Sequence, residues 1–397
     1  MSRNNRIFLT SWGFPTQDTK GNPFVKEIAE AICRKGTEVV VIIPEFVGLR
    51  TIFSYRKKHS IKSGNLLIKE VPIFNFIPSV TGLLQVQKYL QKLQFNKSLL
   101  RIAKEVGMPD AVQFHYILYS SGYLFTSFME KNKIPYVLFE HSPGSSFIQG
   151  ISKGFGGFDT LPRLKQFVKG ASLRIARIQK YQKKLEEVYE CEFELLASFI
   201  STEYESLKIH DSDLNNDPTF KFVSVGSLIP RKNFELLIDS FHAAFKDVDG
   251  VSLTIVGGGP LETELLDQIA KLGLQKRVRL MGEIRKPEVL RHIVNSHSLV
   301  VSSKHETFGN TVIEGMYCGK PVVSTKCDGP ETILTPETGI LCEKNAESLA
   351  QAMIDMCNNY NQFDSGKIKQ YCIDHYSEGE VMGKLSVLYK NKLSIDI

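Results

Sequence analysis

Several features are scarce or missing in this chain of 397 residues, and each absence excludes a class of protein. No apolar run approaches the roughly 18 residues that a membrane-spanning helix needs. The N-terminus, MSRNNRIFLTSWGF, lacks the apolar core and the cleavage site of a secretory signal peptide, so we expect a cytoplasmic protein. The seven cysteines form no CxxC pair and are odd in number, which argues against both a disulfide framework and a zinc site.

Charge is distributed unevenly along the chain, although the net charge is only +6. Residues 1–205 hold 28 Lys and Arg against 18 Asp and Glu, whereas the remaining 192 residues hold 21 against 25. The first half is therefore the part that we expect to meet a polyanion or an anionic membrane surface. The apolar and charged fractions, 42% and 23%, are those of a globular protein long enough for two or three domains.

Strand-like and helix-length patterns alternate throughout the chain, which predicts βαβ units with parallel sheets. A polar stretch rich in turn formers, residues 210–218 (HDSDLNNDP), is typical of a linker. We therefore predict an α/β protein of two doubly wound domains, residues 1–209 and 219–370, that face each other across a cleft. The strands expected are Arg6–Ser11, Glu38–Ile43, Ala111–Phe114, Tyr136–Phe139, Phe220–Val225, Ser252–Val256, Arg277–Leu280, Leu299–Ser303 and Val322–Ser324.

The last segment, residues 371–397, contains a helix signal of its own. Ser377 is a candidate cap, and Glu380 stands at the third position of a capping box. The apolar residues Val381, Leu385 and Leu388 fit one face of that helix. The pattern requires this face to be buried but leaves open which domain covers it.

The stretch Leu299–Pro330 carries two carboxylates eight positions apart, Glu306 and Glu314. Glu306 follows a predicted strand, and Glu314 falls early in a helix that opens near Asn310. Ligands of open α/β sheets bind at this edge, and the free N–H groups at Phe308–Thr311 would attract a phosphate. Because carboxylates suit pairs of sugar hydroxyls, the pattern favours a sugar-nucleotide site. The alternative is that these acids only complement the helix dipole.

A second signal lies in FVSVGSLIPRKNFELLIDSF, where Arg231 and Lys232 occupy a strand-to-helix loop. The Arg fork and the Lys point charge can clamp a diphosphate, although a solvated basic pair is the alternative. The run Val256–Pro260 (VGGGP) also follows a strand, but it is not a GxGxxG sequence. A dinucleotide fingerprint, and with it a dehydrogenase, is therefore poorly supported.

Taken as an ordered set, these motifs resemble those of the retaining glycosyltransferases of family 4, which have the GT-B fold of two Rossmann-like domains. The resemblance is carried by VGSLIPRKNFELLIDSF, TIVGGGPLETEL, VRLMGEI and SSKHETFGNTVIEGMYCGKPVVST. Glu306 and Glu314 match the family's E-x7-E signature. The fold implies that the helix in 371–397 crosses back to the N-terminal domain, whose own sequence resembles the family only loosely.

The resemblance implies a role for each matching residue. Arg231 and Lys232 would bind the donor diphosphate and stabilise the leaving group. Glu306 would hold hydroxyls of the transferred sugar, Glu314 would bind the ribose, and His141 would approach the sugar from the first domain. No metal or other cofactor is implied. The other implied donor-binding residues are Gly21, Gly226, Ser227, Gly257, Gly282, Glu283, Ile284, Phe308, Gly309, Asn310 and Thr311, with His115 as a weaker candidate.

The implied function is transfer of a sugar, with retained anomeric configuration, from a UDP- or GDP-sugar to a glycan or lipid-linked acceptor. Bacterial envelope polysaccharide synthesis is the expected setting, and no nucleic acid is expected as a partner. Two alternatives stay open, a nucleotide-sugar epimerase of related fold and a non-catalytic partner subunit.

The segment 161–185 has eight Lys and Arg, no acid, and apolar residues at a spacing of three to four. A basic amphipathic helix of this kind can lie on an anionic membrane. We therefore expect it to bring the protein to the inner face of the cell membrane. An ordinary surface helix, with its apolar residues on the core, is the alternative.

Overall fold

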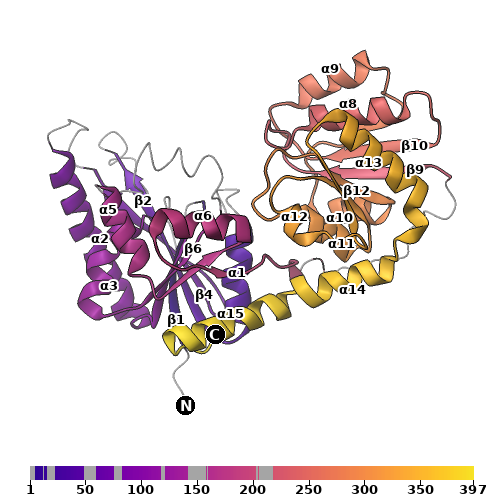
Figure 1. Ribbon diagram of the computed structural model, residues 1–397. Coiled ribbons are helices and arrows are strands. Elements are labelled where there is room, and N and C mark those ends of the chain that lie inside the picture. The colour runs from indigo at the N-terminus through magenta and orange to yellow at the C-terminus, as the bar shows by residue number, and fades with distance from the viewer. Residues whose placement is uncertain are drawn as a thin grey trace. The chain divides into compact units, whose positions relative to one another are not determined.

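The computed structural model describes residues 5–11, 13–15, 23–48, 60–75, 83–117, 121–141, 158, 160–202, 204 and 218–397. The chain divides into two compact units (Figure 1). One consists of Met1–Leu196 together with Met382–Ile397, and the other of Ala197–Val381. The predicted linker lies outside the described residues except for Pro218. None of the described helices combines the length and the hydropathy needed to cross a bilayer.

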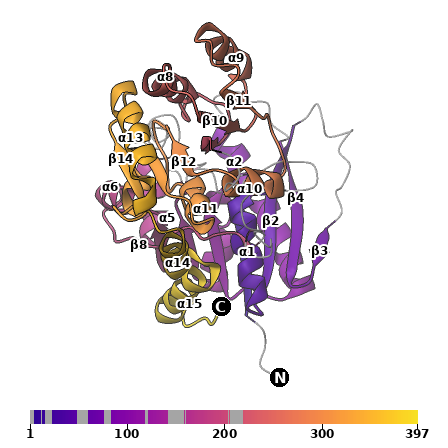
Figure 2. The ribbon, with the colours of Figure 1, turned by 90° about the vertical axis from the view of Figure 1, so that its right-hand side faces the viewer.

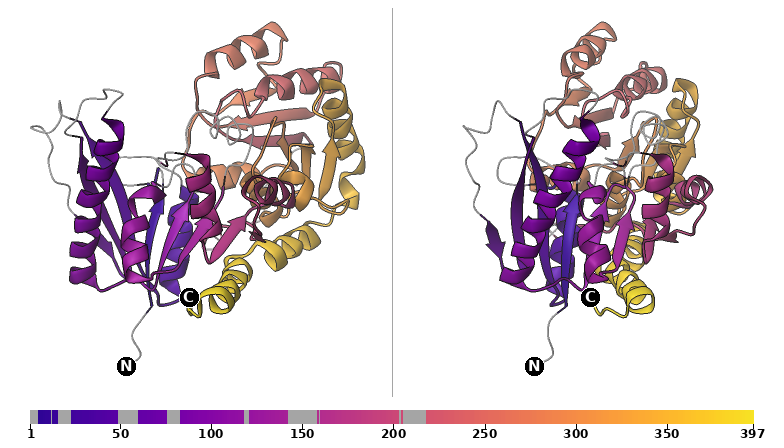
Figure 3. Two further views of the ribbon diagram at one scale, coloured as in Figure 1. Left: turned by 60° about the vertical axis from the view of Figure 1, so that its left-hand side comes forward. Right: turned by 90° about the vertical axis from the view of Figure 1, so that its left-hand side faces the viewer.

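The first unit is built on an eight-stranded sheet in the order β3-β4-β2-β1-β5-β6-β7-β8 (Figures 1 and 3). Its strands are parallel except for the β3–β4 pair. Strands such as β1 are buried along almost their whole length because helices cover both faces of a parallel sheet. The elements are β1 (Arg6–Ser11), α1 (Pro23–Arg34), β2 (Glu38–Val47), β3 (Ile61–Ser63), β4 (Leu66–Phe74), α2 (Leu84–Val106), β5 (Ala111–His115), η1 (Gly122–Leu124), α3 (Thr126–Asn132), β6 (Tyr136–Phe139), α5 (Leu161–Lys169), β7 (Leu173–Ala176), α6 (Gln179–Tyr189), β8 (Glu194–Leu195) and, from Met382 onward, α15 (Glu378–Leu393).

The second unit is a six-stranded parallel sheet in the order β11-β10-β9-β12-β13-β14 (Figure 2). Counted from the first strand of the unit this is 3-2-1-4-5-6, the strand order of the Rossmann fold. The elements are β9 (Phe220–Val225), α8 (Phe234–Phe245), β10 (Val251–Val256), α9 (Glu262–Lys271), β11 (Val278–Leu280), α10 (Lys286–Val294), β12 (Ser298–Val301), α11 (Asn310–Tyr317), β13 (Val322–Thr325), α12 (Pro330–Ile333), β14 (Gly339–Cys342), α13 (Ala346–Asn359), η3 (Tyr360–Gln362) and α14 (Ser365–Tyr376).

The predicted α/β class with parallel sheets is confirmed. Strands β1, β6 and β9 have the predicted bounds, and the others differ from prediction by a few residues at their ends. The largest difference is in β2, which continues to Val47 because residues 43–47 pair with residues 70–74 of β4. All seven cysteines are unpaired thiols, and burial raises the pKa of Cys318 to about 12.

The prediction of one basic amphipathic helix over 161–185 is wrong. The segment forms helix α5, strand β7 and the first part of helix α6. Three of its apolar residues, Leu164, Val168 and Ile175, are fully buried in the first unit. Lys165 and Lys169 instead form a surface ion pair with Glu190. The segment therefore forms neither the predicted membrane-facing helix nor a single surface helix, although its buried apolar residues face the core as the alternative expects.

The C-terminal helix α15 packs against the first unit through residues 382–397. The Oη of Tyr389 donates a hydrogen bond of 2.5 Å to Oε1 of Gln113, and both residues are buried. On the surface, Lys35 Nζ donates to the hydroxyl of Ser386 at 3.0 Å. At the start of the helix the N–H of Glu380 lies 3.4 Å from the Ser377 hydroxyl, as the capping pattern predicts. The apolar residue Leu385 is buried.

We expect Tyr389→Phe to lower the free energy of unfolding by about 1–2 kcal/mol, because it leaves the buried Gln113 oxygen without its donor. Chemical denaturation followed by circular dichroism measures this change. Tyr89→Phe is the matched control, because Tyr89 is 62% exposed. The control should change stability by less than about 0.5 kcal/mol. Equal stability of the two variants would contradict the role given to the Tyr389 bond.

Candidate active site

The candidate site lies at the carboxyl edge of the second sheet, where β9 and β12 are neighbours. From β9 the chain builds outward through β10 and β11, and it then returns to the other side of β9 with β12. Such a switch point leaves a crevice in which α/β proteins bind ligands. The loop after β9 carries Arg231 and Lys232, and the loop after β12 carries Glu306. Lys232 and Glu306, which are 74 positions apart in the sequence, are thus in contact.

The three predicted charged residues form one ion-pair cluster. Lys232 Nζ lies 2.6 Å from Glu306 Oε1, and Arg231 Nη1 lies 3.0 Å from Glu306 Oε2. The Ser303 hydroxyl donates a further hydrogen bond of 2.6 Å to Oε1. Glu306 is only 7% exposed, whereas the side chain of Arg231 is 45% exposed. These contacts use both acceptor positions of Oε1 but leave Oε2 room for one more donor.

The electrostatics of the cluster keep Glu306 ionised. Burial by itself would raise the pKa of this carboxyl group. The positive charges of Lys232 and Arg231, with hydrogen bonds from Lys232 and Ser303, outweigh burial, so the pKa lies below its ordinary value. A carboxylate held in this way can accept hydrogen bonds but is a poor proton donor at neutral pH.

The backbone of Glu306 is fixed by the loop that follows β13. Its N–H donates to the carbonyl of Cys327 at 2.7 Å, and its own carbonyl accepts from Gly329 N–H at 3.0 Å. A Cβ at Gly329 would lie 1.9 Å from the carbonyl oxygen of Phe308, so only glycine permits this approach. Neither this loop nor Ser303 is predicted as part of the site from the sequence. The Asp-Gly-Pro turn after β13, and a hydroxyl three residues before Glu306, were the available signals.

The predicted glycines of the neighbouring loops lie next to one another. Gly257, at φ +148°, approaches so closely that a Cβ there would lie 1.9 Å from the carbonyl oxygen of Gly226. Gly257 N–H also donates to the carbonyl of Gly282 at 2.9 Å. A Cβ on Gly226 would in turn touch the side chain of Lys232. The loops after β9, β10 and β11 therefore form one continuous surface, on which Ser227 and Glu283 are exposed and Ile284 is half-buried.

Helix α11 begins beside Glu306, as predicted. Gly309 caps it with φ +105°, a conformation that favours glycine, and Phe308 just before it is buried. Asn310 and Thr311 are its first two residues, and the N–H groups of a first helical turn have no partner within the helix. Glu314 is half-buried on the second turn of the same helix.

In the first unit, His115 and His141 belong to a buried polar chain. His115 Nδ1 lies 2.7 Å from His141 Nε2, and His115 Nε2 lies 2.6 Å from the side-chain nitrogen of Gln113. Arg177 Nε donates to His141 Nδ1 at 3.2 Å. Burial, and then the charge of Arg177, hold the pKa of both histidines well below the ordinary value. Both are therefore neutral at pH 7. Because His141 Nδ1 accepts from Arg177, His141 Nε2–H donates to His115 Nδ1. Gly21 lies outside the described residues.

The Rossmann-type sheets and the cluster of two cations and a carboxylate at a switch point define a class, the glycosyltransferases of GT-B fold. Residues 205–370 match the family model of glycosyl transferases group 1, so this part of the chain is a domain of that family.

Individual relatives agree with this assignment. The uncharacterized glycosyltransferase MJ1178 of Methanocaldococcus jannaschii is 24% identical over 78% of this chain and 80% of its own. The lipopolysaccharide core biosynthesis glycosyltransferase LpsD of Rhizobium meliloti is 35% identical over 31% of this chain and 34% of its own. Matches to curated relatives span from about a third to four fifths of their length. The structure of Anabaena HepE in complex with UDP has a TM-score of 0.70, with 17% identity over 98% of this chain and all of that one.

We expect Glu306→Gln to lower the free energy of unfolding at pH 7 by about 3 kcal/mol, because two cations lose their counter-charge. A carboxyl group whose pKa is depressed by folding contributes stability above its unfolded pKa of about 4.3, and this is lost as pH falls through the folded pKa. The variant should therefore lose less stability than the wild type between pH 5 and pH 3, where denaturation curves can be compared.

Glu343→Gln, at an exposed ion pair with Lys326, is the control and should change little. Parallel acid profiles for wild type and Glu306→Gln would contradict the depressed pKa.

Proposed function

We propose that the protein is a retaining glycosyltransferase that moves a sugar from a UDP- or GDP-sugar to a hydroxyl of a glycan or lipid-linked acceptor. One observation carries this proposal: Glu306 lies between Lys232 and Arg231 at the switch point of a Rossmann-type sheet. A donor needs a positive site for its diphosphate and an acceptor-rich site for its sugar hydroxyls, and this cluster supplies both within one hydrogen-bonded group.

The same cluster suggests how a donor is received. An incoming diphosphate carries more negative charge than the carboxylate of Glu306, and it competes for the two cations. Arg231, whose side chain is about half exposed, can turn to it without leaving a buried site. Oxygens of Glu306 then become available to hydroxyls of the sugar. The N-terminus of α11 faces the same edge of the sheet and offers free N–H groups to phosphate or sugar.

The chemistry follows from these charges. Fixed cations stabilise a leaving nucleoside diphosphate, and loss of one such group costs about 3 kcal/mol in other enzymes. In our proposal Arg231 and Lys232 perform this role without a divalent metal. A double displacement would need a free carboxylate as nucleophile. In our proposal the oxygens that the diphosphate frees on Glu306 accept hydrogen bonds from sugar hydroxyls, so Glu306 is poorly suited to that attack, and we favour a front-face route with retained configuration.

Similar proteins support the donor and acceptor classes. HepE was solved in complex with UDP, and LpsD is named for lipopolysaccharide core biosynthesis. By analogy we assign this chain a nucleotide-sugar donor and an envelope glycan or lipid-linked acceptor, at the cytoplasmic face of the cell membrane.

We expect Lys232→Ala and Glu306→Ala each to reduce transfer by at least about 10²-fold, because each removes a charge that the transition state uses. Nucleoside diphosphate release in the presence of acceptor and of EDTA measures turnover, and circular dichroism checks folding. The control is Lys165→Ala, which breaks a surface pair with the same N–O distance of 2.6 Å. Near-wild-type turnover of either site variant would remove its residue from the mechanism, and loss of activity with EDTA would show a metal requirement.

We expect a UDP- or GDP-sugar to raise the melting temperature of the wild type, because a ligand that binds only the folded state stabilises it in proportion to saturation. Lys232→Ala should abolish the shift, whereas Lys165→Ala should retain it. A transferase releases free nucleoside diphosphate only when acceptor is present. Conversion of the donor without release would instead identify an epimerase, and binding without either reaction a partner subunit.

A further inference from the structure

Helix α2 of the first unit is apolar on two opposite faces. Its inner face, with Phe95 and Leu99, is fully buried in the core of the unit. Its outer face carries five apolar side chains that are each between 39% and 47% exposed: Leu83, Val86, Leu90, Leu93 and Leu100. A surface helix normally has polar residues on the side away from the core.

The outer residues form one stripe rather than scattered points. Their spacing of three, four, three and seven places them on one side of the helix over five turns. Tyr89, which is also exposed, adjoins the stripe near the start of the helix. Figure 1 shows α2 at the margin of the first unit, and among the described elements none is labelled on its outer side. Contiguous exposed apolar surface of this kind marks an interaction site.

The charges of α2 indicate what the stripe meets. The helix carries five cations, Lys88, Lys92, Lys97, Arg101 and Lys104. Its one acid, Glu105, is already paired with Lys69, with 2.6 Å between Nζ and Oε1. Lys97 stands within the stripe itself, between Leu93 and Leu100. Three of these cations, Lys97, Arg101 and Lys104, are exposed on or beside the outer face, which is therefore apolar and cationic.

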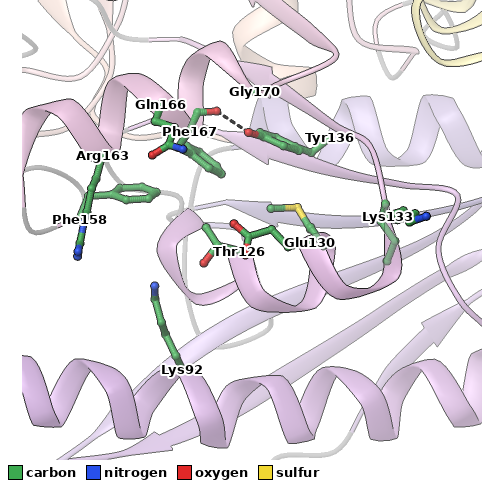
Figure 4. Close-up of a pocket in the computed structure, with 12 residues that line it drawn as sticks. Lys92, Thr126, Glu130, Lys133, Tyr136, Phe158, Arg163, Gln166, Phe167 and Gly170 are labelled. Atoms are coloured by element: carbon green, nitrogen blue, oxygen red, sulfur yellow. Dashed lines mark hydrogen bonds between the residues drawn. The ribbon is translucent and has the colours of Figure 1, made fainter.

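A cationic cavity adjoins the same helix. It has a volume of about 600 Å³ and is lined by residues of the first unit (Figure 4). Lys92 reaches it from α2, Arg163 from α5, and Lys133 from the end of α3. Glu130 is the acid among the residues that line it. Its cations extend the positive charge of α2 across the neighbouring surface.

We propose that the outer face of α2 docks the protein on an anionic lipid bilayer. Apolar side chains between lysines and arginines are what an interfacial helix needs, since the side chains enter the acyl boundary and the cations meet the anionic headgroups. A second copy of the chain fits less well, because pairing two such faces would bring cations together without acids to balance them. Docking here would hold the first unit at the surface in which a lipid-linked acceptor resides.

Vesicle flotation of the full-length protein tests the proposal without any catalytic step, so its outcome is independent of the proposed transferase activity. One set of vesicles contains phosphatidylcholine alone, and the other contains phosphatidylcholine with 30% phosphatidylglycerol. We expect the wild type to bind the anionic vesicles in about 0.1 M salt, to bind them at least tenfold more weakly in about 0.5 M salt, and to bind neutral vesicles weakly. The variant Leu90→Ser with Leu93→Ser should bind at least fivefold more weakly than the wild type.

The matched control is Leu266→Ser, on the exposed face of α9, which should bind as the wild type does. Lys97→Glu with Arg101→Glu tests the charge independently of the apolar surface, and it should abolish the preference for anionic lipid. Circular dichroism verifies that each variant folds. Equal flotation of wild type and the Leu90, Leu93 variant would overturn the proposal, as would absence of wild-type binding in low salt. So would a wild-type dimer in analytical ultracentrifugation that the Leu90, Leu93 variant dissociates.

Discussion

The carboxylate of Glu306 between two cations is the interaction on which the site depends. A charge that is removed from water is stable only when it is paired and hydrogen-bonded. Glu306 therefore needs Lys232 and Arg231, and the two cations are in turn held close together by Glu306. Without a ligand the cluster has a net charge of +1, from two cations and one carboxylate, and an added diphosphate releases the carboxylate. One charged group can thus be prepared for both an anion and a sugar hydroxyl.

The sheet explains why this cluster forms where it does. Because β9 and β12 are neighbours in space but not in sequence, their following loops diverge to opposite sides and leave a gap between them. Closely packed backbone forms the walls of that gap. At Gly257 and Gly329 a Cβ would lie 1.9 Å from a carbonyl oxygen of the adjacent loop. These glycines act through packing between loops, which differs from the phosphate contact that a glycine fingerprint would imply.

The sequence predicted the strands and the cluster of Arg231, Lys232 and Glu306 because both depend on local signals, namely apolar runs and the loops after them. It failed at 161–185, where a spacing of three to four residues matched a helix although β7 interrupts it. Apolar spacing tells that residues are buried but not by which element. Helix α2 shows a different limit of the sequence pattern. Its apolar residues occupy both faces, and only the fold shows which face is covered. Long-range contacts decide both cases.

The buried row of hydrogen-bonded side chains in the first unit limits the further contacts that His141 can make. In a neutral imidazole one nitrogen donates and the other accepts, and the two nitrogens of His141 lie against Arg177 and His115. A sugar hydroxyl can therefore bond to His141 only by replacing one of these partners. His115 is in turn linked through Gln113 to Tyr389 on α15. A substitution at His141 would therefore also affect the hydrogen bond of Tyr389 on the C-terminal helix. These hydrogen bonds couple the last residues of the chain to the centre of the first sheet.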